Sequence, residues 1–310
     1  MEQAVSFGYG GQQIVGILHR PDGPAGERPE LGLVLAHSGS RGRLGNTFHY
    51  PFMARQLARM GYPVLRCDPP GLGDSSGTIA TGPTRSFYRE IQEGRFVGDT
   101  LAAIKELRRL TSPRHVVLIG ICGGAITALE AAALAEGVSG AALLSIPVTL
   151  DFARTEAPGV IPPEYARRYL RSLYASKIFS PRAWLRLVTL RSDVSLIRSY
   201  VAAILRGLMP APAQPGARKT GASRFNPRFL ESLQKMMQGK RRVVFIFGED
   251  DRFRWDFERE FYDIYWHTDA AHAKYCSIHK IPHCNHMLTM REWQEQAVQL
   301  IADWLPSVVR

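Results

Sequence analysis

The sequence contains no long hydrophobic run. No stretch of about 18 uninterrupted apolar residues occurs, so no membrane-spanning helix is expected. The first residues lack a basic segment followed by an apolar one, which predicts no signal peptide. Only four cysteines are present, none in a Cys-x-x-Cys spacing, and this favours reduced thiols over disulfides or zinc. We therefore expect a cytoplasmic protein without a cofactor.

Acidic residues are few in one segment only. Residues 151–240 contain 16 Lys and Arg but 5 Asp and Glu, whereas the rest of the chain contains 23 of each kind, so this segment accounts for the whole net charge of +11. A local basic surface attracts an acidic partner, such as an acyl carrier protein or the phosphates of coenzyme A. Solvated helix faces and a membrane surface are the alternatives. No nucleic-acid-binding module is recognisable.

Apolar runs alternate with helix-like stretches over most of the chain, and no internal repeat is visible. This alternation predicts a mostly parallel, eight-stranded α/β sheet with helices on both faces. The expected strands are 5–9, 14–18, 31–36, 64–67, 116–119, 141–146, 243–247 and 275–281, and the expected helices are 47–60, 89–110, 125–135, 256–266 and 291–304.

The alternation stops between residues 148 and 238. Candidate helices at 163–176, 181–190 and 194–208 are followed by a Pro-, Gly- and Ala-rich stretch, 209–227, which is expected to be mobile. We predict a core of residues 1–147 and 239–310, with residues 148–238 forming a basic helical cap inserted after the sixth strand.

A glycine-rich turn follows the strand at 116–119. It reads Gly120-Ile121-Cys122-Gly123-Gly124 and leads directly into a helix. Strand, tight turn and helix form the context of a nucleophile elbow, in which glycines let the two backbones pass closely. The turn is expected to raise the thiol of Cys122 above the sheet edge, where the first amides of the helix favour negative charge. The alternative is a small buried thiol in a glycine turn.

Two more reactive groups follow later strands in the chain. Cys122, Asp251 and His286 occur in the order nucleophile, acid, histidine, and the carboxyl ends of parallel strands meet at one edge of the sheet. His286 would take or hold the thiol proton, and Asp251 would orient the imidazole. Asp250 and Asp151 are alternatives for the acid, and a structural role is the alternative for His286.

The remaining candidates surround this predicted triad. A tetrahedral intermediate needs hydrogen-bond donors, which the backbone N–H of Gly123 and one from Ser38 or Gly39 would supply. A zinc site is conceivable at His279, His283, Cys284 and His286, but strand alternation would separate these side chains, so we expect no metal. His37 is expected to shape the oxyanion loop. The candidates for binding substrate or partner are His37, Arg41, Tyr169, Tyr174, Trp184, Arg167, Arg168 and Arg171.

These motifs together resemble the α/β-hydrolases. His37-Ser38-Gly39 is similar to the family's oxyanion loop, residues 68–75 to its D-x-x-G-x-G-x-S turn, residues 248–251 to its acid strand end, and Asn285-His286 to its histidine loop. Residues 45–46 and 61–76 and the Arg- and Tyr-rich start of the cap also resemble exosortase-A-associated hydrolases, more loosely. The departure is cysteine in place of serine. Dienelactone hydrolases share that cysteine but lack such a cap.

The resemblance implies an acyl hydrolase. A thiolate accepts an acyl group from a thioester at little cost in energy, so Cys122 favours thioester or ester cleavage through a covalent acyl-enzyme, with an apolar acyl pocket lined by the cap. One alternative is an acyltransferase that passes the acyl group from a carrier-protein or coenzyme A thioester to an amine or alcohol. Another is a non-catalytic binding protein that keeps the fold.

Overall fold

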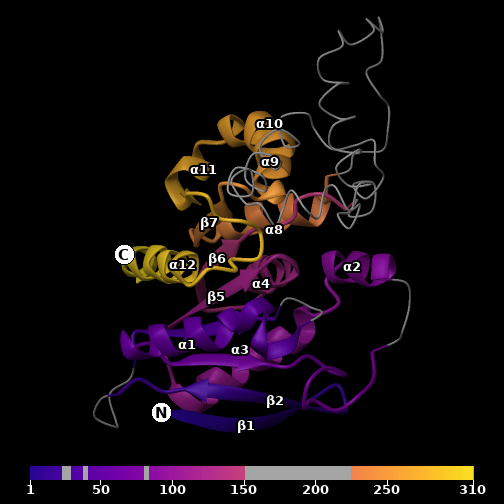
Figure 1. The fold of residues 1–310 in the computed structure, drawn as a ribbon, viewed down its shortest axis with the longest axis vertical. Coiled ribbons are helices and arrows are strands. Elements are labelled where there is room, and N and C mark those ends of the chain that lie inside the picture. Colours follow the sequence, from indigo (N-terminus) through magenta and orange to yellow (C-terminus); the bar gives the residue numbers. More distant parts are fainter. Residues whose placement is uncertain (23–28, 38–40, 80–83, 151–224, 310) are drawn as a thin grey trace, which may run out of the picture. The chain divides into compact units, whose positions relative to one another are not determined.

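A single eight-stranded sheet organises the chain (Figure 1). The computed structural model describes residues 1–22, 29–37, 41–79, 84–150 and 225–309. The strand order is β1-β2-β4-β3-β5-β6-β7-β8; β1–β2 and β2–β4 are antiparallel and the other pairs are parallel, which confirms the predicted sheet. The strands are β1 (Glu2–Tyr9), β2 (Gln12–His19), β3 (Leu31–Ala36), β4 (Val64–Cys67), β5 (His115–Ile121), β6 (Val138–Leu144), β7 (Arg242–Gly248) and β8 (Cys276–Ile281).

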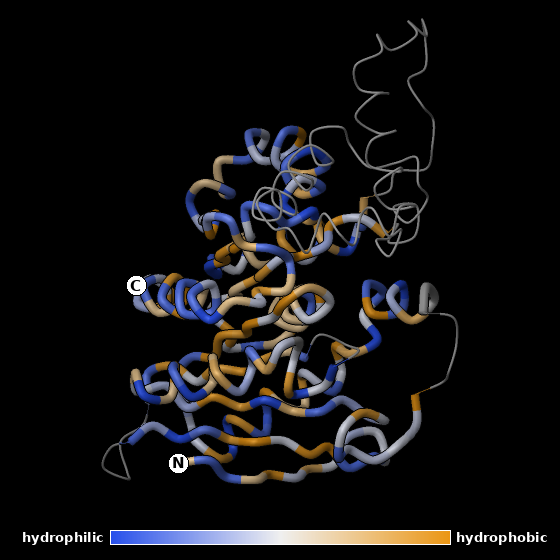
Figure 2. Tube along the Cα trace, viewed as in Figure 1, coloured by the Kyte–Doolittle hydropathy of each residue, from blue (hydrophilic) through white to orange (hydrophobic). Residues whose placement is uncertain are grey.

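Helices cover both faces of the sheet. Side chains of α1 and α12 share one buried cluster with alternate residues of the strands, and side chains of α3, α4 and α8 share a second cluster with the others. In Figure 2 the hydrophobic residues concentrate along the central strands. The α-helices are α1 (His49–Arg59), α2 (Thr84–Gln92), α3 (Val97–Thr111), α4 (Gly123–Leu134), α8 (Pro227–Gln238), α9 (Arg252–Phe257), α10 (Asp263–Tyr265), α11 (Ala270–Tyr275) and α12 (Arg291–Trp304). Shorter turns of 3₁₀ or π type occupy Gly42–Leu44, Asn46–Phe48, Glu258–Tyr262, Trp266–Thr268 and Leu305–Val309.

Two predicted helices are broken in the structure. The helix expected over 89–110 is two helices, because the chain turns at Gly94, whose φ of 91° is in the region that side chains avoid. The helix expected over 256–266 consists of short α, π and 3₁₀ pieces between α9 and α11. No described helix is both long and apolar enough to cross a membrane.

The predicted boundary of the cap is wrong at its second end. Residues Met1–Leu150 and Phe225–Arg310 form one compact unit, so α8 belongs to the core. Phe225 forms a β-bridge with Thr149, and Asn226 caps α8 by accepting a hydrogen bond from the Arg228 amide at 3.0 Å. Residues 225–227 of the stretch expected to be mobile therefore begin a packed helix. The three candidate cap helices and the rest of that stretch lie outside the described residues.

Candidate active site

Cys122 is the single residue between β5 and α4. Its φ of 56° and ψ of −122° are unfavourable for a residue with a Cβ, as at many functional turns. A Cβ at Gly120 would collide with the carbonyl of Gly124, and one at Gly124 would collide with the carbonyl of Ala36, so the close crossing needs both glycines. Gly123 is the first residue of α4, and its N–H belongs to the turn that lacks intrahelical acceptors.

Tyr50 of α1 holds this turn against β3. Its fully buried hydroxyl donates to the carbonyl of Ala36 at 2.6 Å and accepts from the amide of Ile121 at 3.1 Å. The phenol therefore ties the carboxyl end of β3 to the residue before Cys122. The sequence analysis missed Tyr50, since an aromatic residue on the apolar side of a helix gives no sign that its hydroxyl joins two strands.

His286 lies against Asp251. The Nδ1 atom of His286 is 3.3 Å from both carboxylate oxygens of Asp251, whose side chain is completely buried. Asp251 also begins α9, where its Oδ1 accepts from the amide of Phe253 at 2.9 Å, and the ring of Phe253 packs edge-on against the imidazole with centroids 4.7 Å apart. The carboxylate is therefore fixed by the helix that follows it.

The imidazole also contacts the thiol of Cys122. Burial alone would lower the pKa of His286, but the charge of Asp251, its hydrogen bond and a side-chain hydrogen bond with Cys122 outweigh burial and raise this pKa well above 6.5. His286 is 27% exposed in its side chain, so the pair is sheltered but open on one side. Thiol, imidazole and carboxylate thus meet at one edge of the sheet.

Among the described residues, neither Asp250 nor the candidate metal site has such geometry. Asp250 is partly exposed, with its amide donating to the carbonyl of Cys284 at 2.9 Å, and it is Asp251 that contacts the imidazole. Asp151 lies outside the described residues. His283 is 88% exposed in its side chain and faces Glu249, and the described residues contain no cluster of three potential metal ligands.

The other three cysteines are buried in the core, and none of the four forms a disulfide. Burial raises the pKa of Cys276 and of Cys284 to about 12, and raises that of Cys67 as well. Cys122 differs because it is half-buried and beside His286. These three thiols serve as internal references for any reaction at Cys122.

His37 follows β3 and contacts Asp99 of α3. Its Nε2 atom is 3.0 Å from the Asp99 carboxylate, and the ring is 3% exposed and edge-on to Phe96. This buried contact favours a role in shaping the loop over direct contact with substrate, and Asp99 was not foreseen. Arg41 is exposed before the 3₁₀ turn Gly42–Leu44. The other predicted binding residues lie outside the described residues, namely Ser38, Gly39, Arg167, Arg168, Tyr169, Arg171, Tyr174 and Trp184.

Comparison with known proteins agrees with this fold. The model of the alpha/beta hydrolase family matches residues 33–303. Esterase Pf2001 of Pyrococcus furiosus superposes with a TM-score of 0.57 at 14% identity, covering 100% of this chain and 93% of its own. Proline iminopeptidase of Mycobacterium smegmatis superposes with 0.56 at 15% identity, covering 99% of both chains. A membrane phospholipase A described as a bacterial virulence factor gives 0.51 at 18%, covering 99% and 86%. Among curated proteins none matches significantly.

Proposed function

The chain belongs to the alpha/beta hydrolase family, and on that premise we propose that it cleaves acyl thioesters or esters through an acyl group covalently held on Cys122. The observation that carries the proposal is the contact of His286 with both Cys122 and Asp251. Fold alone would not support this chemistry, because one fold carries many activities. The similar structures include an esterase, a peptidase and a phospholipase, all of which act on acyl bonds.

The geometry supports the following sequence of steps. His286, whose pKa is raised, contacts the sulfur of Cys122 and accepts its proton, so that the sulfur reacts as a thiolate. The thiolate attacks the carbonyl carbon, and the amide of Gly123 stabilises the oxyanion. The bond to the leaving thiol or alcohol then breaks, and His286 donates a proton to that group. Water attacks the acyl-cysteine, His286 accepts its proton, and the carboxylic acid departs from the regenerated thiolate.

Cysteine is the reason to favour thioesters. Transfer from a thioester to Cys122 exchanges one thioester for another, so the acyl-enzyme keeps its acyl group activated for water. A Cys122→Ser variant would form a more stable oxygen ester, and we expect its turnover of thioesters to fall by at least about tenfold. Unchanged thioester turnover by this variant would remove the basis for the thioester preference, while leaving ester hydrolysis open.

The test is intact-mass analysis of the full chain after mixing with acyl thioesters of increasing chain length. We expect a transient adduct with the mass of the acyl group, mapped by peptide analysis to Cys122, and steady release of free thiol. Cys276→Ala is the matched control, because it removes a buried thiol away from His286 and should form the adduct normally. An adduct on Cys67, Cys276 or Cys284 instead would contradict the proposal. Products carrying an added amine or alcohol would identify an acyltransferase.

The basic segment 151–240 suggests the donor. We propose that a carrier protein or coenzyme A thioester docks through these cationic residues. Salt should then weaken turnover of a carrier-bound acyl group by raising KM, while turnover of a small uncharged thioester stays constant. Turnover of both substrates with the same salt dependence would contradict docking by charge without affecting the proposal for Cys122.

A further inference from the structure

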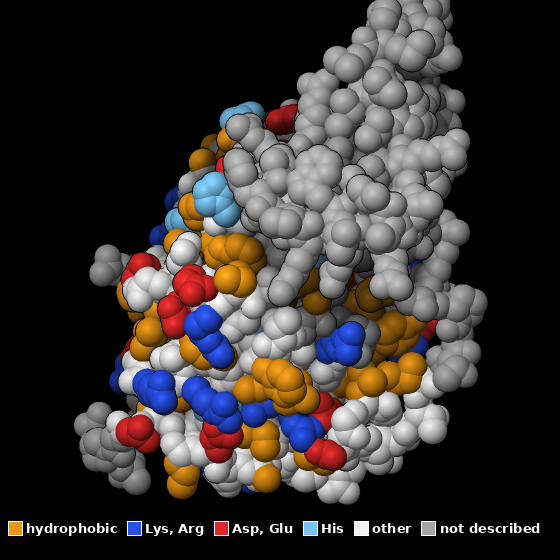
Figure 3. Space-filling model, viewed as in Figure 1, with side chains coloured by type: hydrophobic (Ala, Val, Ile, Leu, Met, Phe, Trp, Pro, Cys, Tyr) orange, Lys and Arg blue, Asp and Glu red, His pale blue; other side chains and the backbone are white. Residues whose placement is uncertain are grey.

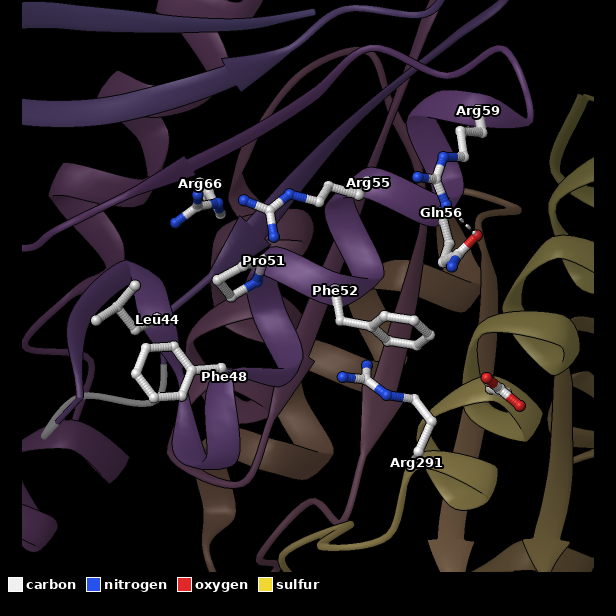
Figure 4. A pocket seen from close by; sticks show the side chains of 10 residues that line it. Leu44, Phe48, Pro51, Phe52, Arg55, Gln56, Arg59, Arg66 and Arg291 are labelled. Carbon is white, nitrogen blue, oxygen red and sulfur yellow. Dashed lines mark hydrogen bonds between the residues drawn. The ribbon is translucent and has the colours of Figure 1, made fainter.

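An arginine-rich groove lies beside α1, separate from the residues of the candidate active site. It has a volume of about 730 Å³ and is bordered by α1, the start of α12 and the 3₁₀ turns before α1 (Figure 4). Figure 3 shows Lys and Arg side chains gathered with apolar ones over this part of the surface. The groove is lined by Leu44, Phe48, Pro51, Phe52, Arg55, Gln56, Arg59, Arg66, Arg291 and Glu295.

Arg66 of β4 is the unusual member of this groove, because it is charged and only 4% exposed. Its Nε donates to Nε2 of His19 at 2.9 Å and its Nη1 donates to the carbonyl of Arg43 at 3.2 Å. Both partners are neutral acceptors, and in the described part of the chain no carboxylate lies within ion-pair distance of Arg66. A buried cation normally requires a counter-ion, since removal from water is costly.

Two further arginines of the groove, Arg59 and Arg291, contact neutral side chains. Arg59 donates to the side chain of Gln56 at 3.5 Å, and Arg291 donates to that of Gln294 at 3.0 Å, while its guanidinium lies 3.9 Å from the centre of the Phe52 ring. Neither forms an ion pair with any carboxylate of the described residues.

The nearby carboxylates are few and largely engaged. Arg55 is paired with Glu2 at 2.6 Å, and Arg43 is paired with Asp68 and Asp74. Glu295 is the one acidic residue in the lining, against four arginines. The groove therefore concentrates positive charge that its own residues do not balance.

We propose that this groove binds an organic phosphate. Guanidinium groups bind phosphate oxygens through paired N–H donors, and such charge-assisted bonds are strongest where water is partly excluded, as it is around Arg66. The exposed rings and chains of Phe48 and Leu44, 68% and 43% exposed, offer an apolar surface for the organic part. This site is distinct from the acyl chemistry and does not use Cys122.

The test is titration calorimetry on the full chain with three probes, at low and at moderate salt. Adenosine 3′,5′-bisphosphate carries phosphates and a ring, inorganic phosphate carries the anion alone, and phosphatidylglycerol vesicles present phosphate on a lipid surface. We expect one bisphosphate per chain, at least about tenfold tighter than inorganic phosphate, with weaker binding as salt rises. Equal affinity for phosphate and bisphosphate would contradict the proposal that the groove recognises the organic part of the ligand. Binding to vesicles alone would contradict the proposal that the groove binds a free organic phosphate.

Variants locate the binding. Arg59→Gln and Arg291→Gln change exposed side chains and should each weaken the bisphosphate about tenfold, since a hydrogen bond to a charged group is worth about that factor. Arg66→Met should abolish binding of the bisphosphate. If Arg66→Met fails to fold, the affinities of Arg59→Gln and Arg291→Gln test the proposal instead. Arg89→Gln is the matched control, because this arginine is on α2 and pairs with Glu93 outside the groove. Equal affinity in Arg59→Gln, Arg291→Gln and Arg89→Gln would overturn the proposal.

Discussion

Two histidines show how differently two regions of this molecule set the charge of an imidazole. His286 in the candidate active site faces the carboxylate of Asp251, which helps to raise its pKa well above 6.5. His19 of β2 faces the guanidinium of Arg66, and burial together with this positive charge lowers its pKa to about 4. The candidate active site therefore carries its own counter-ion, whereas His19 beside Arg66 is kept neutral, and Arg59, Arg66 and Arg291 form no ion pair within the described residues. Under the two proposals above, the first region carries out a reaction and the second receives an anion.

The largest effect is expected from removing the sulfur. Cys122→Ala should lower kcat/KM for acyl thioesters by about 10⁴-fold or more, because no covalent intermediate can form. Steady-state kinetics would measure the loss, with far-ultraviolet circular dichroism as the control for folding. Retention of most of the activity would mean that the region around His286 is not the reaction centre. The contrast between a reactive region and an anion-binding groove would then no longer hold.

Removing the counter-ion tests the charge on His286 directly. Asp251→Asn should lower kcat by about 10³-fold while still capping α9, since asparagine also accepts the Phe253 amide. Loss of the carboxylate favours neutral imidazole, so the alkaline limb of the kcat/KM profile should move to lower pH. A profile that keeps its alkaline limb in the variant would show that Asp251 does not sustain the imidazolium.

Stability at acid pH tests whether His19, which contacts Arg66, is neutral in the folded protein. The folded pKa of His19 lies below the unfolded value near 6.5, so the unfolded chain binds the proton first and stability falls as pH drops from 6.5 towards 4. His19→Gln can still accept from Arg66, and we expect it to lose about 2 kcal/mol less than the wild type over this range. Urea unfolding at pH 7 and pH 4.5 measures the difference. Parallel losses in both proteins would contradict a neutral, buried His19.

The smallest effect is expected at the hydroxyl that joins the two strands. Tyr50→Phe leaves the carbonyl of Ala36 and the amide of Ile121 without that partner, which should destabilise the fold by about 1–3 kcal/mol. Because the elbow is then less firmly held, kcat should fall by a few-fold with KM nearly constant. Urea unfolding and steady-state kinetics measure the two changes, and Tyr62→Phe, a tyrosine outside this bridge, is the control. Equal effects of the two substitutions would contradict the positioning role of Tyr50.

The part of the site that sequence could predict depends on strand ends. Cys122, Asp251 and His286 follow apolar strands, and parallel strands bring their carboxyl ends together, so their meeting was foreseeable. Asp251 was the predicted acid with Asp250 as an alternative, and the burial of Asp251 and its contact with His286 distinguish these two residues.

Other features depend on tertiary contacts that leave no local pattern. The bridge through Tyr50, the contact of Asp99 with His37 and the desolvation of Arg66 each join residues far apart in the sequence. The break at Gly94 was missed for a related reason. Apolar spacing continues through it, and only the packing around the turn shows where one helix ends and the next begins.

The bridge between Thr149 and Phe225 has a consequence for the length of the segment that joins these two residues in this chain. It brings the two ends of an insertion side by side on the core, immediately before Asn226, the N-terminal capping residue of α8. Closing a loop between ends already held together costs free energy that grows only slowly with its length. Whole segments between these two residues can accordingly be exchanged, lengthened or shortened while β6, β7 and the reaction centre keep their positions.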